Sequence, residues 1–255
     1  MKEGPKIGIY MLSAARVVSP RMIIHKLIGH HLKHRDDSDF YVLQARDAIR
    51  WIRSKGGSVG GGVRALDLGC GHGAFGVELA KLGCDVTYAD EANGLSAEIQ
   101  GAKFICVNLD QDDIPSLGEY NLVVCSNVLE HLARPERFLA SAHRLLSSKG
   151  TLFLSWTNWL SPWGGHEFSP FHYLGSHRGH LIYDRLTGKQ RKHTPHENLF
   201  PTYIGQILMV IRQSPTLRVL AVAPRYYTEL GFLMALPVLR EFLAWNCAML
   251  IGRKV

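Results

Sequence analysis

The residues with the clearest chemical role form a glycine-rich turn that follows a short apolar stretch. Asp67 precedes Gly69, Gly71 and Gly73, and the stretch before it is suited to a strand buried on both faces. Glycine has no Cβ and adopts positive φ without penalty, so the backbone N–H groups of this turn can approach a ligand closely. The turn therefore predicts a site for a nucleotide-like molecule.

The nature of that nucleotide depends on the acidic residue of the turn. The spacing of Gly71, Gly73 and Gly76 satisfies the pattern of dinucleotide-binding turns, so a nicotinamide oxidoreductase is one alternative. The carboxylate of Asp67 argues against it, because it would repel a pyrophosphate and attract a ligand with an ammonium or sulfonium group.

Further acidic residues follow the next two strands that the sequence predicts. Asp90 ends a strand expected over residues 85–90, where a carboxylate can accept both hydroxyls of a ribose. Asp110 and Gln111 follow a strand expected over residues 102–108 and could meet the edge of an adenine. Together with the turn, these carboxylates suit a cationic nucleoside without phosphates.

A second set of candidates lies in the connection over residues 158–202, which is long and rich in histidine and aromatic residues. Long ordered loops in compact domains are usually lids or binding loops. Because histidine titrates near neutrality, His166, with Glu167 beside it, is the first candidate for a base acting on an acceptor hydroxyl, and His172 is the second. The structural alternative is that these side chains only order the lid by hydrogen bonding.

The same histidines do not predict a metal site. His166 and Glu167 followed by His172 lack the spacing that places two imidazoles on one face of a helix. We therefore expect no structural or catalytic metal.

The elements that position these residues are short apolar strands alternating with helices. Strands are expected over residues 63–68, 85–90, 102–108, 120–126, 150–157, 217–224 and 244–252, and helices over 40–55, 75–82, 135–146, 203–213 and 233–243. This alternation predicts an α/β fold with a doubly wound, Rossmann-like parallel sheet. A ligand would then lie at the carboxyl ends of the strands, near the point where the strand order reverses.

The chain divides into two predicted parts. Residues 1–62 are expected to form an N-terminal helical cap and linker, in which a basic amphipathic stretch over 7–34 either packs on the main domain or lies on a membrane surface. Residues 63–255 are expected to form the binding domain, with residues 158–202 as its substrate lid.

The charge, cysteine content and hydrophobicity of the chain limit which partners and which cellular location are expected. The net charge is +7, with basic residues concentrated toward both ends, which indicates either an anionic partner or solvated peripheral helices. The five cysteines lack a metal-type pair and indicate reduced thiols in the cytoplasm. No stretch approaches the ~20 uninterrupted apolar residues of a membrane-spanning helix. We expect a cytoplasmic protein, with peripheral membrane contact through the basic N-terminal segment as an option.

At four places in order, the chain resembles class I S-adenosylmethionine-dependent methyltransferases, particularly the group labelled type 11. The matching segments are residues 67–73, Asp90, residues 110–115 and residues 120–132. The resemblance implies S-adenosylmethionine as cofactor and a sheet of six parallel strands with an antiparallel seventh. It also implies that Asp67 and the glycines of the turn hold the methionine portion.

The resemblance assigns further roles. Asp90 would hold the ribose hydroxyls with Glu91 as a second acid, and Asp110 would hold the adenine amino group. Asn127, at the end of the fourth strand, joins the expected cofactor-binding residues. His131 would lie near the reactive methyl group, which makes it the third candidate base and more readily a positioning residue.

These features predict methyl transfer to a small-molecule or lipid-linked acceptor, at a hydroxyl. A nucleic-acid methyltransferase is one alternative, but residues 126–129 lack an amino-methylation motif of the Asn/Asp-Pro-Pro-Tyr/Phe type, so no nucleic-acid partner is expected. A non-catalytic cofactor-binding module that docks a partner through its basic helices is the other. The apolar tail over residues 230–251 favours a lipid-like acceptor.

Overall fold

The computed structural model describes residues 38–110, 114 and 117–254. The expected N-terminal helices over residues 7–34 and the expected adenine contact of Gln111 lie outside these residues. Helix α2 (Ser38–Ser54) is the first described element. It buries Ala45, Ala48, Ile49 and Ile52, whose spacing follows one face of a helix.

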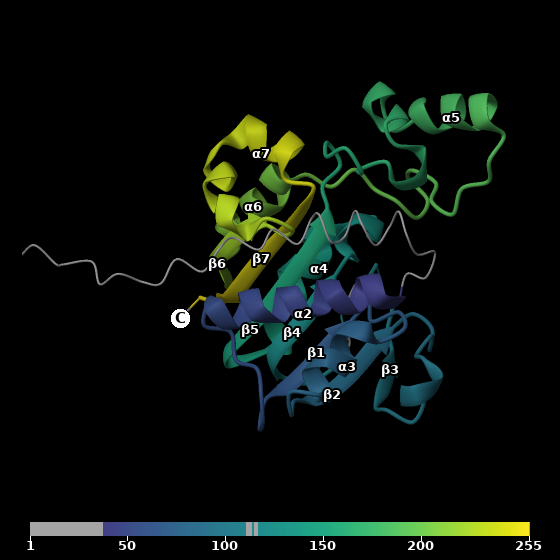
Figure 1. The fold of residues 1–255 in the computed structure, drawn as a ribbon. Coiled ribbons are helices and arrows are strands. Elements are labelled where there is room, and N and C mark those ends of the chain that lie inside the picture. The colour runs from purple at the N-terminus through teal and green to yellow at the C-terminus, as the bar shows by residue number, and fades with distance from the viewer. Residues whose placement is uncertain (1–37, 111–113, 115–116, 255) are drawn as a thin grey trace, which may run out of the picture.

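A seven-stranded sheet with the order β3-β2-β1-β4-β5-β7-β6 forms the centre of the molecule (Figure 1). Its strands are β1 (Arg64–Leu68), β2 (Asp85–Asp90), β3 (Phe104–Cys106), β4 (Tyr120–Ser126), β5 (Leu146–Thr157), β6 (Leu217–Pro224) and β7 (Asn246–Arg253). Strands β1 to β5 pair in parallel, and β7 is antiparallel to both β5 and β6. This confirms the prediction of a Rossmann-like sheet with six parallel strands and an antiparallel seventh. The order reverses between β1 and β4, which is where such sheets bind ligands.

Helices cover both faces of the sheet because successive strand residues point to opposite sides. Leu122 and Val124 pack in one apolar cluster with α2 and α3 (Ala74–Ala80). Val123 and Cys125 pack in the other with α4 (Pro135–Ser141) and α6 (Ile204–Gln213). The two clusters hold the strand ends, and with them the candidate residues, in a rigid frame.

Residues 158–202, which were expected to form a lid and keep that name here without implying the role, are an ordered segment with helices of its own. It contains the 3-10 helices η4 (His166–Phe168) and η5 (Phe171–Leu174) and the helix α5 (Gly179–Thr187), which stand beyond the end of β5 in Figure 1. A small core of Trp159, Phe168 and Leu199 holds the segment together. The segment returns to the sheet where the N–H of Phe200 donates to the carbonyl oxygen of Glu130 at 2.7 Å.

Several predicted elements differ in extent. The prediction of one helix over residues 233–243 is wrong. The chain instead forms the 3-10 helix η6 (Thr228–Ala235) and then α7 (Pro237–Leu243). Pro237 lacks the N–H that would continue the earlier helix, and it stands at the first turn of α7. The helix expected over 135–146 ends at Ser141 and continues as the 3-10 helix η3 (Ala142–Leu145), and η1 (Ala97–Ile99) and η2 (Leu129–His131) complete the elements. Within the described residues, the helices are too short or too polar to cross a bilayer.

Candidate active site

The glycine turn between β1 and α3 has the geometry that its composition predicts. Gly69, Gly71 and Gly73 have φ values of 70°, 50° and 82°, in the left-handed region. A Cβ at Gly69 would lie 2.3 Å from Cγ2 of Val128, and one at Gly73 would lie 2.5 Å from Cδ1 of Ile99. A Cβ at Gly71 would meet no described atom within 4 Å. The outer two glycines are therefore required for packing, and Gly71 borders open space that a ligand can use.

Asp67 lies buried in β1, directly before this turn. Its Oδ2 accepts a hydrogen bond from the N–H of Gly76 at 2.7 Å, which ties the strand to the first turn of α3. Burial raises the pKa of Asp67 to about 7, and the nearby charge of Asp90 adds to the shift. A cationic ligand would favour the charged form of this carboxyl group.

Asp90 and Asp110 connect the ends of neighbouring strands. The N–H of Gly71 donates to Oδ2 of Asp90 at 2.7 Å, and the N–H of Glu91 donates to Oδ1 at 2.7 Å. Oδ1 of Asp110 accepts from the N–H of Ala133 at 2.9 Å, so it joins the end of β3 to the segment after β4. Both carboxylates thus lie at the carboxyl edge of the sheet, and Glu91 is exposed beside Asp90.

The arrangement fits a nucleoside that carries a cationic amino-acid chain. Open space at Gly71 adjoins Asp90, which is suited to a ribose, and the buried carboxyl group of Asp67 lies before the same turn. The thiol of Cys70 does not add a nucleophile here, since burial and the charges of Asp67 and Asp90 raise its pKa to about 12.

Asn127 stands at the carboxyl end of β4 with a left-handed φ of 57°. Its Oδ1 accepts hydrogen bonds from Nη1 of Arg225 at 3.1 Å and from Nδ2 of Asn246 at 3.0 Å. Its Nδ2 donates to Oε1 of Gln44 at 3.3 Å. The side chain is thus engaged with three other elements, and a cofactor contact would use the backbone of Asn127 or displace one of these bonds.

Arg225 is a buried cation that was not predicted from the sequence. It follows β6 directly, and its Nη1 also donates to Oγ of Ser155 at 2.9 Å. Burial lowers its pKa. Its position at the carboxyl end of a strand was the signal that could have identified it, since ligands of such sheets bind at that edge.

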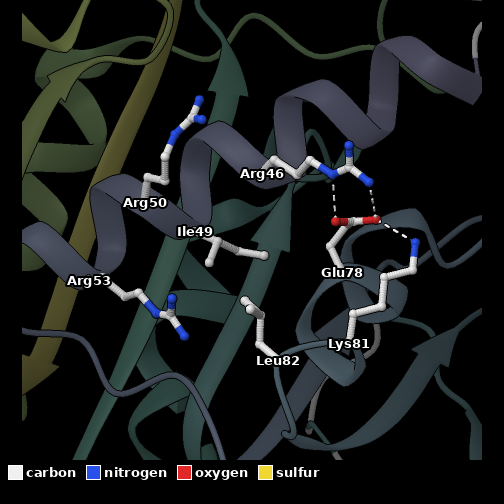
Figure 2. Close-up of a pocket in the computed structure, with 7 residues that line it drawn as sticks. All are labelled: Arg46, Ile49, Arg50, Arg53, Glu78, Lys81 and Leu82. Carbon is white, nitrogen blue, oxygen red and sulfur yellow. Dashed lines mark hydrogen bonds and ion pairs between the residues drawn. The ribbon is translucent and has the colours of Figure 1, made fainter.

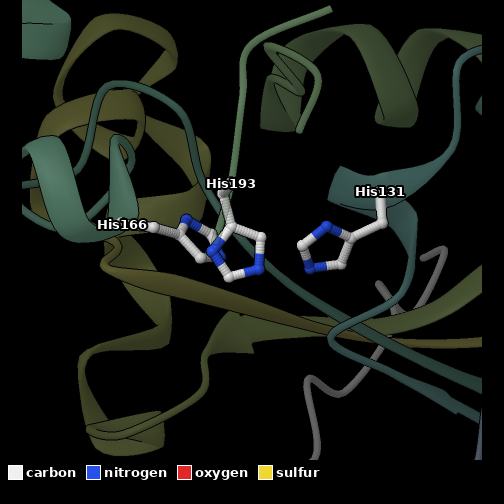
Figure 3. A group of neighbouring side chains, drawn as sticks. All are labelled: His131, His166 and His193. Carbon is white, nitrogen blue, oxygen red and sulfur yellow. The ribbon is translucent and has the colours of Figure 1, made fainter. Parts of the chain in front are cut away.

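Three histidines meet at the carboxyl end of β4: His131, His166 and His193. Figure 3 shows His166 and His193, from the lid, facing His131, which follows β4. The ring centres lie 5.6 Å apart for His131 and His166, 5.2 Å for His131 and His193, and 4.7 Å for His166 and His193. His193 was not predicted, because no local spacing links it to the other two.

Among the described residues, the carboxylate of Glu167 makes no hydrogen bond with the ring of His166, its neighbour in sequence. Instead, Nδ1 of His193 lies 2.9 Å from both Glu167 carboxylate oxygens. Burial raises the pKa of Glu167, but the hydrogen bond from His193 and the nearby imidazoles outweigh it, so the pKa lies below its usual range. Glu167 therefore orients His193 and supplies negative charge to the cluster.

His166 and His172 occupy different environments in the lid. His166 has a left-handed φ of 48°, its Nδ1 is buried without a hydrogen-bond partner in the described structure, and burial lowers its pKa. His172 is only 1% exposed, and its Nε2 lies 3.0 Å from the carbonyl oxygen of Ser161. Its ring packs on Trp159 with centres 5.6 Å apart. His172 thus lies in the lid core, outside the three-histidine cluster.

A surface hollow of about 270 Å³ lies between α2 and α3, at the end of α3 away from the glycine turn (Figure 2). Glu78 in this hollow pairs with Arg46 at 2.7 Å and with Lys81 at 2.8 Å. Its position separates it from the carboxyl edge of the sheet, so it is not part of the candidate site.

The fold and site identify the class. Residues 38–190 match the family model described as a methyltransferase domain, and the chain belongs to this family as a class I S-adenosylmethionine-dependent methyltransferase. Methyltransferase activity and S-adenosylmethionine as cofactor are thereby confirmed.

Particular relatives come from mycobacteria. An uncharacterized methyltransferase of Mycobacterium ulcerans is 31% identical over 229 residues, which cover 85% of this chain and 88% of that protein. One of Mycobacterium tuberculosis is 29% identical over 248 residues, covering 93% of this chain and 96% of the relative.

Solved structures share the fold. A TehB-like S-adenosylmethionine-dependent methyltransferase from Corynebacterium glutamicum has a TM-score of 0.52 at 18% identity, covering 91% of this chain and 96% of that one. Magnesium protoporphyrin IX methyltransferase from Synechocystis, with bound S-adenosylhomocysteine, has a TM-score of 0.52 at 15% identity, covering 91% and 93% of the two chains.

Proposed function

We propose that this methyltransferase acts on the hydroxyl group of a small-molecule or lipid-linked acceptor. The observation that carries the proposal is the cluster of His131, His166 and His193 at the carboxyl end of β4. The cluster lies just beyond Val128, whose side chain packs against the glycine turn at Gly69. An acceptor held at the cluster would therefore lie close to the cofactor cradle.

The residues of the cradle would bind and orient the cofactor. When bound, S-adenosylmethionine supplies an electrophilic methyl group on a sulfonium. Asp67 would attract the cationic methionine portion, Asp90 with Glu91 would hold the ribose, and Asp110 would hold the adenine amino group. Asn127 would fix the end of β4 beside them through its bonds to Arg225.

The lid residues would prepare the acceptor. Methyl transfer to a hydroxyl releases one proton, and its removal by neighbouring groups contributes about 10²–10⁴-fold in rate. The lowered pKa of His166 keeps its ring neutral near pH 7, with a lone pair available to promote that loss. Glu167 and His193 add negative charge and orientation, while His172 supports the lid from its core.

Apolar surface beside the lid supports a lipid-like acceptor. Phe232 and Val238, on η6 and α7, are 64% and 70% exposed, and Trp163 in the lid is 51% exposed. Nδ2 of Asn158, where the lid begins, donates to the carbonyl oxygen of Glu241 in α7, so the start of the lid contacts α7. Exposed apolar side chains on neighbouring segments can form part of a binding surface. The five free cysteines support a cytoplasmic location.

The His166→Ala variant tests the role of the cluster. We expect at least a 100-fold lower rate of methyl transfer into a lipid and metabolite extract, with the dissociation constant of S-adenosylhomocysteine within twofold of the unchanged protein. His143→Ala is the matched control, because His143 lies at the opposite end of β5, where its Nδ1 contacts the carbonyl oxygen of Ala140. A weaker cofactor affinity with an unchanged single-turnover rate would refute the assignment.

A further inference from the structure

We propose that His131, His166 and His193 bind a divalent transition-metal ion of the zinc type, with an open position for the acceptor oxygen. The inference rests on the proposed function, because it says how the cluster would promote loss of the hydroxyl proton. The sequence predicts no metal here, because histidines that are neighbours along the chain lack metal-ligand spacing. The fold instead recruits ligands from the end of β4 and from two separate parts of the lid (Figure 3).

The geometry of the rings carries the proposal. One ligand nitrogen of each histidine lies within 4.8 Å of the other two. Metal–nitrogen bonds of about 2.0–2.1 Å in a tetrahedral site place imidazole centres about 5 Å apart and the nitrogens about 3.4 Å apart. The observed separations of 4.7–5.6 Å between ring centres match this spacing, so ring rotations of modest size bring the nitrogens together.

Neighbouring groups orient two of the rings as metal ligands are usually oriented. Metal-binding histidines generally donate their other N–H to a carboxylate or a backbone carbonyl. Nδ1 of His193 lies 2.9 Å from the carboxylate of Glu167, and Nδ1 of His131 lies 2.7 Å from the carbonyl oxygen of Asn198. With Nδ1 protonated and engaged, each neutral ring offers the lone pair of Nε2.

His166 completes the set with a buried nitrogen. Its Nδ1 is buried and has no hydrogen-bond partner among the described residues. A buried, unpaired polar atom is costly, and a metal bond would satisfy it. The left-handed φ of 48° at His166 is unusual for a residue with a side chain, and such backbone conformations cluster at functional sites.

The charges around the cluster suit a dication. Glu130 is buried beside His131, its Oε1 accepts from the N–H of Thr157 at 2.8 Å, and its Oε2 is buried without a hydrogen-bond partner in the described structure. Glu167 supplies a second carboxylate through His193. Two carboxylates around three neutral imidazoles would balance the charge of one divalent ion.

The ligand set also matches the proposed chemistry. Three protein nitrogens leave a fourth position open, as in catalytic rather than structural zinc sites. A hydroxyl bound there would lose its proton to solvent water more readily, just as zinc lowers the pKa of bound water to about 7. The oxygen then forms the bond to the methyl carbon while the carbon–sulfur bond breaks, and the sulfur keeps the electron pair.

Equilibrium dialysis of the full chain against Zn²⁺, followed by elemental analysis, tests the site without cofactor or acceptor. We expect one bound zinc per chain, and at least a 100-fold weaker affinity for His131→Ala and His193→Ala. Glu167→Gln keeps the size of the side chain and removes its charge, and it should weaken binding by about 10–100-fold. His143→Ala should bind zinc as the unchanged protein does, and circular dichroism shows that each variant is folded.

Substitution of Co²⁺ gives a spectroscopic readout. We expect visible absorption bands of a low-symmetry site in the unchanged protein, and their loss in folded His193→Ala. Equal zinc affinity in folded His193→Ala and the unchanged protein, or no stoichiometric zinc in the unchanged protein, would overturn the inference. A labelled methyl product without zinc binding would refute the metal site and leave the proposed function standing. Zinc binding without methyl transfer would support the metal site and refute the proposed function.

Discussion

The replacement Asp67→Asn should have opposite effects on cofactor binding and on the free energy of unfolding, because the buried carboxyl group aids the first and lowers the second when it is ionised. Burial raises the pKa of Asp67 from 3.8 to about 7 in the folded protein. Since one unit corresponds to about 1.4 kcal/mol, ionisation of the buried group removes up to about 4 kcal/mol of folding stability.

The sign follows from proton binding. The folded state holds the Asp67 proton more tightly than the unfolded state, so this stability is fully present below pH 3.8, declines as the pH rises, and is lost above about pH 7. An asparagine cannot ionise, and its oxygen can still accept the N–H of Gly76. Its amide N–H₂ group needs a hydrogen-bond partner, and leaving it unpaired would reduce the gain in stability by about 1–3 kcal/mol. We expect Asp67→Asn to be about 1–3 kcal/mol more stable than the unchanged protein at pH 8, and no more stable at pH 4.

Cofactor binding should change in the opposite direction. If the charged carboxylate attracts the ammonium group, a pKa of about 7 leaves about a tenth of Asp67 ionised at pH 6 and about nine tenths at pH 8, so affinity for S-adenosylhomocysteine rises about tenfold between them. Asp67→Asn should bind weakly at both pH values. Calorimetric titration measures the affinities, and urea unfolding measures the stabilities. A pH-independent affinity in the unchanged protein, together with a destabilised variant at pH 8, would refute the reasoning.

Four further substitutions test the packing at the site, in the lid core and in the hollow between α2 and α3. Gly69→Ala should cost about 1–3 kcal/mol in urea unfolding because its Cβ would lie 2.3 Å from Val128, whereas Gly71→Ala should mainly weaken cofactor binding; equal unfolding costs would contradict this. His172→Ala removes a buried ring from the lid core and should speed amide exchange in residues 158–202 while the strands keep their protection; unchanged lid exchange would argue against a packing role. Glu78→Gln should change stability by less than about 1 kcal/mol because its partners Arg46 and Lys81 are 56% and 58% exposed, and a loss above ~2 kcal/mol would show stronger coupling.

The sheet and the cofactor cradle could be predicted because their signals are local. Strands β2, β4 and β6 have the bounds that their apolar runs predict. The turn after β1 was predicted from its glycines, which are close together in the sequence. The break at Pro237 was also a local signal, although the predicted helix overran it.

The acceptor side of the site depends on contacts between distant parts of the chain. His193 joins His131 and His166 only because the lid folds back over the end of β4, where Phe200 pairs with Glu130. Helix α5 has little buried surface beyond Gly179, so an apolar pattern was too weak to predict it. No spacing rule connects such residues before the fold is known.

The most direct test is mass spectrometry of lipid and metabolite extracts incubated with the protein and S-adenosylmethionine carrying an isotopically labelled methyl group. We predict a labelled methyl ether on an acceptor that had a free hydroxyl, formed by the unchanged protein and by His143→Ala but at least 100-fold more slowly by His166→Ala. Binding of S-adenosylhomocysteine with no labelled product in any extract, or a label found on nitrogen, carbon or nucleic acid instead, would contradict hydroxyl methylation.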